Sequence, residues 1–540
     1  MFDFTVTYDE TEKVWHGATK NQMFNKNVSV GEIALFMMRS KNPQEICQVS
    51  DSENTTLTYG QAVTAAIRMA QHFRTLRLTV DDVIGILAPN TTYVMPVVMA
   101  AWFNGNAFHA VNHVLDKDVV KHLFDITKPK IIFCDGQHYD KVKEATKRFK
   151  PKIYTIHNHL PGVNTIEDLF EPTRTEMFYQ AEPLKYGPNQ TMAICCSSGT
   201  TGLPKGVCLS NRVCSTQFGL TNGSSTIFSF AEIDWGTGLY NLICNVLVGG
   251  VRIITTKSFT PQYMLEIIKK YKINFLMTCP SQMAQVSLSP SYTQKTMANT
   301  RLIFMTGSAC SEATLKRIRS VLTTGYLLNI YGTTESGGVA YNYTDYKPNS
   351  VGKIVQNVQL KIVDQFTGER LGPNELGEIC VNSNNKWLGY YNNPEATKQI
   401  VDSEGFTHTG DLGYIDEEHY LYLVERCKDV MKFEHFHYSP HEIEEIVMTI
   451  PGVVDVCVFG VYDEEKNDVP AAAVVKHSES RITERDIVKY VESKSQACYK
   501  RLHYGVYFLD EIPYNKNGKV QRRLVKDICL AIRKIKFSND

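Results

Sequence analysis

The stretch Cys196–Gly206, with the sequence CSSGTTGLPKG, constrains this chain more than any other feature. It follows an apolar run, Met192 to Cys195, that is typical of a buried strand. Glycines let the backbone turn tightly and come close to a ligand. Backbone N–H groups and hydroxyls can then surround phosphate oxygens, and Lys205 adds a positive charge. The sequence therefore predicts a strand that leads into a phosphate-binding loop.

A cluster of Ser, Thr and Gly is by itself most often an ordinary loop. The order of residues distinguishes this one from two common phosphate loops. Lys205 is followed by Gly206 and Val207, whereas a Walker A loop has Ser or Thr after its lysine. The stretch also lacks the G-x-G-x-x-G of a dinucleotide-binding turn.

Further short motifs follow this loop along the chain. They are YGTTE at 331–335, TGD at 409–411, ERCKD at 425–429 and NGK at 517–519. Each is weak alone, but their order is informative. Together with the loop they resemble the motifs of the adenylate-forming superfamily, which includes acyl-CoA synthetases, coumarate-CoA ligases, beetle luciferases and peptide-synthetase adenylation domains. The similarity runs from about Thr58 to Leu524.

The resemblance implies ATP-dependent activation of a small carboxylic acid, with Mg²⁺ as cofactor and coenzyme A as co-substrate. It assigns nucleotide binding to Ser197, Ser198, Gly199, Thr200, Thr201, Gly202, Lys205, Gly307, Ser308, Ala309, Tyr331, Gly332, Thr333, Asp411, Arg426 and Lys428. It makes Glu335 the metal ligand and a catalytic residue together with Thr334, and Lys519 the catalytic lysine of adenylation. It also makes Lys428 the hinge about which a small C-terminal domain rotates.

These residue types suit the chemistry of adenylation. Two anions, a carboxylate and a triphosphate, must come together, so the site needs positive charge and positioning. Glu335 offers a hard oxygen to Mg²⁺. Asp411 can accept from ribose hydroxyls and Arg426 can bind the ribose or a phosphate. Outside this family, each of these charges would be interpreted as a surface ion pair, and Lys519 as the lysine of a hairpin.

Three segments depart from the family's pattern. After the hinge, relatives that use coenzyme A carry Lys-Gly where this chain has Glu434 and His435, although the later Pro, Glu, Ile and Glu are retained. Near the acyl pocket, residues 230–236 read FAEIDWG and lack the family's histidine. Asn517 replaces Ser or Thr in the last motif. The first departure puts thioester formation in question, and the second predicts an altered acyl site.

Chain length and periodicity predict the architecture. A chain of 540 residues needs more than one core, because single cores stop growing at about 250–300 residues. Strand-like runs alternate with helical patterns over about 56–330, which indicates an α/β fold with βαβ units. We expect a large AMP-binding domain at 1–424, a hinge at 425–428 and a small, mobile α+β lid domain at 429–540.

Several elements are predicted individually. A strand at 83–90 precedes a helix at 93–103, and another buried strand lies at 131–134. Residues 239–254 are too short and polar to span a membrane, and favour a buried helix that leads into a strand. Ser439 to Glu442 predicts a capping-box helix start with proline in the first turn, followed by a strand at 453–461.

Charge and cysteine usage narrow the setting. Lys plus Arg equals Asp plus Glu at 57 each, which gives no electrostatic case for nucleic-acid binding. Fourteen cysteines without a C-x-x-C pair and no secretory leader predict a reduced intracellular protein. The cytoplasm is favoured and the peroxisome stays an alternative, although the chain does not end in Ser-Lys-Leu. His435, His437 and His441 allow a zinc site, but a polar loop is the stronger interpretation.

Three functions remain open from the sequence. The first is an ATP-dependent carboxylate–CoA ligase that acts on fatty or aryl acids. The second is an adenylate-forming enzyme that does not use coenzyme A, with luciferase-like oxidation as one case. The third is a non-catalytic acyl- or nucleotide-binding relative, which the retained motif residues disfavour.

Overall fold

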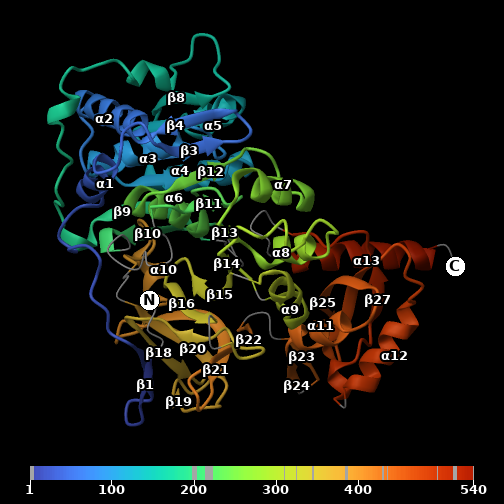
Figure 1. The fold of residues 1–540 in the computed structure, drawn as a ribbon. Coiled ribbons are helices and arrows are strands. Elements are labelled where there is room, and N and C mark those ends of the chain that lie inside the picture. The colour runs from blue at the N-terminus through green and yellow to red at the C-terminus, as the bar shows by residue number, and fades with distance from the viewer. Residues whose placement is uncertain are drawn as a thin grey trace.

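The strands in the described part of this chain form four sheets (Figure 1). The computed structural model describes residues 5–197, 203–212, 223–308, 310–323, 325–342, 346–383, 387–427, 431–434, 436–495, 497–514 and 520–538. Two mainly parallel sheets with helices and one antiparallel sheet precede a smaller C-terminal unit, which has its own hydrophobic cluster. The predicted mixed α/β class is therefore confirmed.

The first sheet contains the strand that leads into the predicted phosphate loop. Its order is β10 (Gly206–Ser210), β9 (Thr191–Cys196), β6 (Phe108–Ala110), β5 (Ile84–Leu87), β7 (Ile131–Asp135) and β8 (Lys152–His157). Neighbours are parallel except β10, which runs antiparallel to β9. The helices on this part of the chain are α1 (Val30–Arg39), α2 (Tyr59–Thr75), α3 (Val94–Phe103), α4 (Lys117–Thr127) and α5 (Tyr139–Ala145). The strands predicted at 83–90, 131–134 and 192–195 are confirmed, as is the helix at 93–103.

The second sheet shares a hydrophobic cluster with the first. Its order is β17 (Lys353–Ile354), β16 (Gly337–Asn342), β15 (Tyr326–Thr333), β14 (Leu302–Thr306), β13 (Phe275–Thr278), β11 (Thr226–Phe228), β12 (Val251–Ile254), β3 (Ile46–Ser50) and β4 (Thr55–Thr58). Its helices are α6 (Gly236–Val248), α7 (Pro261–Tyr271), α8 (Pro280–Ser287) and α9 (Glu312–Val321). Every residue of α3 is buried, and its hydrophobic cluster includes residues of both sheets, so one core joins them. The predicted helix-to-strand segment 239–254 is confirmed as α6 and β12.

The third sheet is antiparallel. Its order is β1 (Val6–Asp9), β2 (Val14–Gly17), β18 (Val358–Val363), β20 (Gly377–Ser383), β21 (Thr407–Ile415) and β22 (Leu421–Arg426), with β19 (Arg370–Leu371) beside β18. The N-terminal hairpin β1–β2 thus joins strands from more than 300 residues away, with His16 opposite Gln359. Helix α10 (Pro394–Lys398) connects β20 to β21.

The fourth sheet forms the C-terminal unit, drawn in orange to red in Figure 1. Its order is β24 (Phe436–Tyr438), β23 (Met431–Phe433), β26 (Asn467–Lys476) and β25 (Val453–Asp463), with β27 (Gly505–Phe508) beside β26. Its helices are α11 (Pro440–Met448), α12 (Glu484–Lys494) and α13 (Arg522–Ser538). The strand predicted at 453–461 is confirmed as part of β25.

The start of α11 differs in one contact from the prediction. Ser439 caps the helix and accepts from the His441 N–H at 3.1 Å, and Pro440 occupies the first turn. Glu442 instead approaches Lys500 at 2.6 Å, so the reciprocal contact of a capping box is absent at this described helix start. The ammonium group of Lys500 comes from another part of the unit, and its ion pair with Glu442 takes the place of the capping-box contact.

Short 3₁₀ helices complete the description: η1 (Gly136–His138), η2 (Ile166–Leu169), η3 (Glu176–Phe178), η4 (Gly187–Asn189) and η6 (Cys498–Lys500). Within the described residues, each helix is too short or too polar to cross a membrane.

Candidate active site

The ends of β14 and β15 place two predicted motifs side by side. The two strands are parallel neighbours, so the residues that follow them meet at one sheet edge. Gly307, at a φ of 111°, and the exposed Ser308 follow β14. Residues 331–335 end β15 and turn toward β16. A Cβ at Gly332 would lie 2.2 Å from the carbonyl oxygen of Gly337, which explains the glycine in this motif.

The base of the phosphate loop is closed by a pair of hydrogen bonds. The Ser197 N–H donates to the carbonyl oxygen of Lys205 at 2.8 Å, and the Lys205 N–H donates to Ser197 Oγ at 2.9 Å. These bonds continue the β9–β10 ladder beyond its last strand residues. Ser198, Gly199, Thr200, Thr201 and Gly202 lie outside the described residues.

Tyr390 lies between the phosphate loop and the YGTTE motif. Its segment runs beside β10, where the Tyr391 N–H donates to the Gly206 carbonyl at 2.8 Å. The Tyr390 hydroxyl donates to Glu335 Oε1 at 2.8 Å, and Lys205 Nζ lies 5.0 Å from the ring centroid. The lysine, the ring and the carboxylate therefore form one connected group.

The TGD motif meets β15 through a buried hydrogen bond. The Tyr331 hydroxyl donates to Asp411 Oδ2 at 2.9 Å, although the two residues belong to different sheets. Arg426, directly opposite Asp411 in the β21–β22 ladder, approaches Oδ1 at 3.2 Å. Burial and the Asp411 charge raise the pKa of Tyr331 well above its usual value, so its hydroxyl stays a donor. Asp411 is thus held by two donors from opposite sides.

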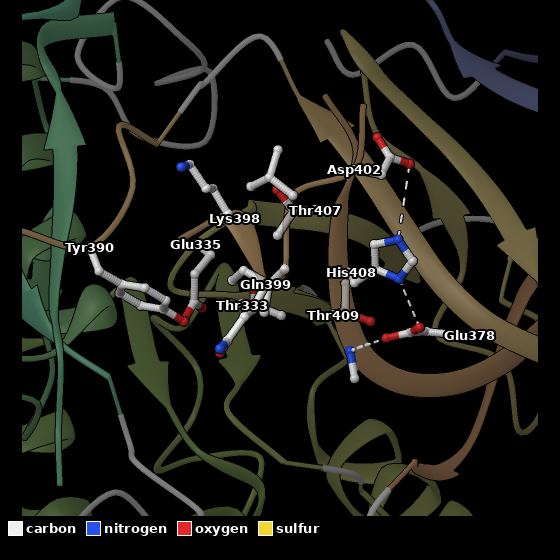
Figure 2. Close-up of a pocket in the computed structure, with 13 residues that line it drawn as sticks. Thr333, Glu335, Glu378, Tyr390, Lys398, Gln399, Asp402, Thr407, His408 and Thr409 are labelled. Carbon is white, nitrogen blue, oxygen red and sulfur yellow. Dashed lines mark hydrogen bonds and ion pairs between the residues drawn. The ribbon is translucent and has the colours of Figure 1, made fainter. Parts of the chain in front are cut away.

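A pocket of about 430 Å³ adjoins these groups (Figure 2). It is lined by Thr333, Glu335, Glu378, Tyr390, Lys398, Gln399, Ile400, Val401, Asp402, Thr407, His408, Thr409 and Gly410. Figure 2 shows Glu335 and Tyr390 at one end and the Glu378–His408 pair at the other. The pocket therefore extends from the YGTTE turn to the TGD segment.

The carboxylate of Glu335 fits a magnesium ligand. It is half-buried, and only Oε1 is occupied, by the Tyr390 hydroxyl. Within the described residues Oε2 makes no hydrogen bond. Mg²⁺ commonly binds one or two protein carboxylates and takes its remaining ligands from water and substrate phosphates. One available carboxylate oxygen near the phosphate loop meets that requirement.

The segment that departs from the family near the acyl pocket follows β11 of the second sheet and is held by Asn112 and His113, which follow β6 of the first sheet. His113 Nδ1 lies 3.1 Å from Glu232 Oε2, and Asn112 Nδ2 donates to Asp234 Oδ2 at 3.0 Å. Burial, and then the nearby Glu232 charge, raise the pKa of Asp234 to about 7. The segment thus acquires an imidazole after all, but from a position 119 residues earlier in the chain.

Some of the remaining predicted residues lie within the described part of the chain and others do not. Lys519, Lys428, Ala309 and His435 lie outside the described residues. Glu434 is exposed at the turn after β23, with a φ of 53°. Among the three histidines of the zinc alternative, His441 approaches Glu444 at 3.6 Å and Glu445 at 3.5 Å. Thr334 is half-buried in the turn that carries Glu335.

Sequence reasoning missed four residues near this site: Tyr390, Glu378, His408 and His113. His408 directly precedes the TGD motif, and this adjacency could have identified it as a candidate site residue. The other three have no local signal, because strand pairing between distant segments brings them to the site.

Solved structures show the same fold. The ATP-bound MatB from Rhodopseudomonas palustris superposes with a TM-score of 0.82 at 23% identity, over 94% of this chain and 99% of that chain. Among curated proteins, 4-coumarate-CoA ligase 1 of Narcissus pseudonarcissus is 29% identical over 498 residues, which is 88% of this chain and 89% of the relative. Luciferin 4-monooxygenase of Photinus pyralis is 27% identical over 509 residues, at 88% and 90% coverage.

The family follows from these matches. The model of the AMP-binding enzyme family matches residues 38–391, and that of the AMP-binding enzyme C-terminal domain matches residues 442–519. This chain belongs to the AMP-binding, adenylate-forming enzyme family.

Proposed function

We propose that this protein is an ATP-dependent carboxylate–CoA ligase that acts on fatty or aryl acids. The relatives named 4-coumarate-CoA ligase support this activity at 29% identity. The observation that carries the proposal is the convergence of Lys205, Tyr390 and Glu335 on one side of the site with Tyr331, Asp411 and Arg426 on the other.

Binding of ATP would use both groups. Residues 197–202 and Lys205 would hold the phosphates, and Asp411 with Arg426 would hold the ribose. Residues 307–309 and 331–333 would border the adenine. Glu335, with Thr334 beside it, would hold Mg²⁺, which when bound neutralises charge on the phosphates.

The first half-reaction joins the acid to AMP. A carboxylate oxygen attacks the α-phosphorus in line, the bond from that phosphorus to the bridging oxygen breaks, and pyrophosphate leaves with the electron pair. Lys205 would balance charge on the leaving phosphates. Lys519 would lie between carboxylate and α-phosphate, which is a role that a flexible ammonium can fill.

The second half-reaction transfers the acyl group. The thiolate sulfur of coenzyme A attacks the acyl carbonyl, the bond to the AMP oxygen breaks, and AMP leaves. We propose that residues 429–540 rotate relative to residues 1–424 about the hinge 425–428, with Lys428 at the pivot. This motion would withdraw Lys519 and admit the thiol.

A second candidate is an adenylate-forming enzyme that passes its product to something other than coenzyme A. Glu434 favours it, because an exposed carboxylate occupies the position where coenzyme-A-using relatives carry a lysine. His435 supports it as well, since it replaces the glycine that clears the pantetheine route. A non-catalytic relative is a weaker candidate, because the charged residues of the motifs are retained.

One experiment separates these functions. Pyrophosphate release is measured with a panel of fatty, aryl and dicarboxylic acids, with and without coenzyme A. The ligase requires release with at least one acid together with a thioester product. Release without thioester supports the second candidate, and no release with any acid supports the third. The Lys519→Ala variant serves as the background control.

A further inference from the structure

The TGD motif lies in an irregular part of β21. Glu378 pairs with Leu412 and Cys380 pairs with His408, so the single residue Ile379 of β20 faces the three residues 409–411 of β21, which bulge. A bulge leaves backbone groups without ladder partners. The side chains around it must then take over those hydrogen bonds.

Glu378 supplies that replacement. Its Oε1 accepts from the Gly410 N–H at 3.0 Å, and its Oε2 accepts from His408 Nδ1 at 2.8 Å (Figure 2). Thr409 closes the other side, since its hydroxyl donates to the Ile379 carbonyl at 2.8 Å and accepts from the Asp411 N–H at 3.1 Å. One carboxylate therefore joins the residue before the bulge, His408, to the centre of the bulge at Gly410.

The bulge determines the direction of Asp411. Gly410 has a φ of 71°, a conformation that other residues rarely adopt, and Asp411 follows directly. Asp411 is 8% exposed, between Tyr331 and Arg426. A change in the backbone at Gly410 would move this carboxylate away from both.

We propose that Glu378, together with His408, is a positioning residue for the nucleotide, holding the 409–411 bulge so that Asp411 meets the ribose hydroxyls. The inference rests on the proposed function, in which Asp411 binds the ribose. Neither Glu378 nor His408 needs to touch the substrate. Both act through the backbone of Gly410.

The pair also predicts a pH dependence. The charged and titratable groups that face His408 within the described residues are Glu378, Cys380, Asp402 at 4.0 Å from Nε2, and the buried Lys361 that pairs with Asp402. The pKa of His408 is raised, chiefly by the hydrogen bond that it donates to Glu378 and against the effect of burial. The ion pair is therefore complete at low pH and is lost as pH rises through the folded-state pKa. ATP affinity should fall over the same range.

The test compares ATP with 2′,3′-dideoxy-ATP, which lacks the ribose hydroxyls. Binding of each to the full chain is measured by titration calorimetry for wild type, Glu378→Ala and Glu378→Gln. Glu378→Ala should weaken ATP binding by about tenfold and dideoxy-ATP binding by less than about twofold, so that discrimination between them is lost. Glu378→Gln keeps an oxygen for Gly410, so it should weaken ATP less and flatten the pH profile.

The matched control is Glu418→Gln. Glu418 lies in the turn of the same β21–β22 hairpin, is 72% exposed and pairs with Lys347 at 2.7 Å, so its loss should leave both affinities unchanged. In an Asp411→Asn background, Glu378→Ala should add nothing to the ATP penalty.

Two results would overturn the proposal. One is an equal loss of ATP and dideoxy-ATP binding in a folded Glu378→Gln or Glu378→Ala variant. The other is full discrimination retained in both. Failure of the proposed function would show in two other measurements. Wild type would not distinguish ATP from dideoxy-ATP, and Asp411→Asn would have no effect on ATP binding. That outcome removes this proposal as well, but it is recognised without any Glu378 variant.

Discussion

The Tyr390 hydroxyl donates a 2.8 Å hydrogen bond to Glu335, while the face of the same ring lies 5.0 Å from the Lys205 ammonium. One side chain thus contacts both the expected metal ligand and the lysine at the end of the phosphate loop. The hydrogen bond fixes one carboxylate oxygen, and within the described residues the other makes no hydrogen bond. The ring face adds a favourable electrostatic contact that limits where the ammonium can lie.

The first prediction separates these two contacts. Tyr390→Phe keeps the ring and loses the hydrogen bond, so the Mg²⁺ concentration that half-saturates adenylation should rise by about tenfold, the lower range for loss of a residue that orients a metal ligand. Tyr390→Leu should in addition raise the KM for ATP. Tyr391→Phe, at the adjacent half-buried tyrosine, is the control. An unchanged Mg²⁺ dependence in Tyr390→Phe would show that the bond does not orient Glu335.

The second prediction concerns Lys519. Lys519→Ala should reduce single-turnover acyl-adenylate formation by about 10²–10³-fold, the range for loss of one preorganised stabilising group. ATP binding should change little, since the lysine acts on charge that develops during the reaction. Lys516→Ala, in the same Tyr-Asn-Lys-Asn-Gly-Lys stretch, provides a matched control. Acyl-adenylate formation at the wild-type rate would remove Lys519 from the mechanism.

The third prediction concerns stability of the C-terminal unit. Burial raises the pKa of Asp455 to about 6, even though the Tyr514 hydroxyl donates to it at 2.8 Å. A raised folded-state pKa means that its contribution to stability is complete below about pH 3.8 and is lost as pH rises through about 6. Asp455→Asn keeps an acceptor for Tyr514 and carries no charge, so it should be the more stable protein at pH 7.5, by about 1 kcal/mol.

Urea unfolding of the full chain at pH 5 and pH 7.5 measures this difference. The gap between Asp455→Asn and wild type should widen at the higher pH. Glu492→Gln, at an exposed carboxylate on α12, corrects for the general change in net charge. A gap that is equal at both pH values would mean that Asp455 titrates as it does in the unfolded chain.

The elements that the sequence could predict are those with local patterns. The strand before the phosphate loop, the buried α6 that leads into β12, and the proline-containing start of α11 each follow from periodicity and from turn residues within a short window. The order of motifs indicated the family for the same reason, since each motif is contiguous in the chain.

The contacts that the sequence could not predict join distant segments. Tyr390 reaches Glu335 because residues 388–391 pair with β10, and Glu378 reaches Gly410 because the β20–β21 register shifts. His113 reaches Glu232 across two sheets. Register and sheet order decide all three, and neither is encoded in a short window. The capping-box contact predicted for Glu442 at α11 was wrong for the same reason, because Glu442 pairs with Lys500, which lies 58 residues later in the chain.

The last prediction tests the segment after the hinge. Glu434 is an exposed carboxylate at a turn with a φ of 53°, where its N–H donates to the Lys466 carbonyl at 2.8 Å. In coenzyme-A-using relatives this position and the next are Lys and Gly. The double variant Glu434→Lys with His435→Gly reverses the charge that an anionic cofactor would meet and removes a side chain from its route. It should lower the KM for coenzyme A by about fivefold, on the order of 1 kcal/mol, or raise thioester turnover.

Thioester formation is followed from pre-formed acyl-adenylate at several coenzyme A concentrations. Glu464→Lys, at an exposed site in the neighbouring β25–β26 turn, makes the same charge change and should have little effect. If wild type is already efficient and the double variant is no better, then Glu434 and His435 do not obstruct the cofactor. If wild type makes acyl-adenylate without thioester and the double variant gains thioester formation, these two residues are what direct the adenylate away from coenzyme A.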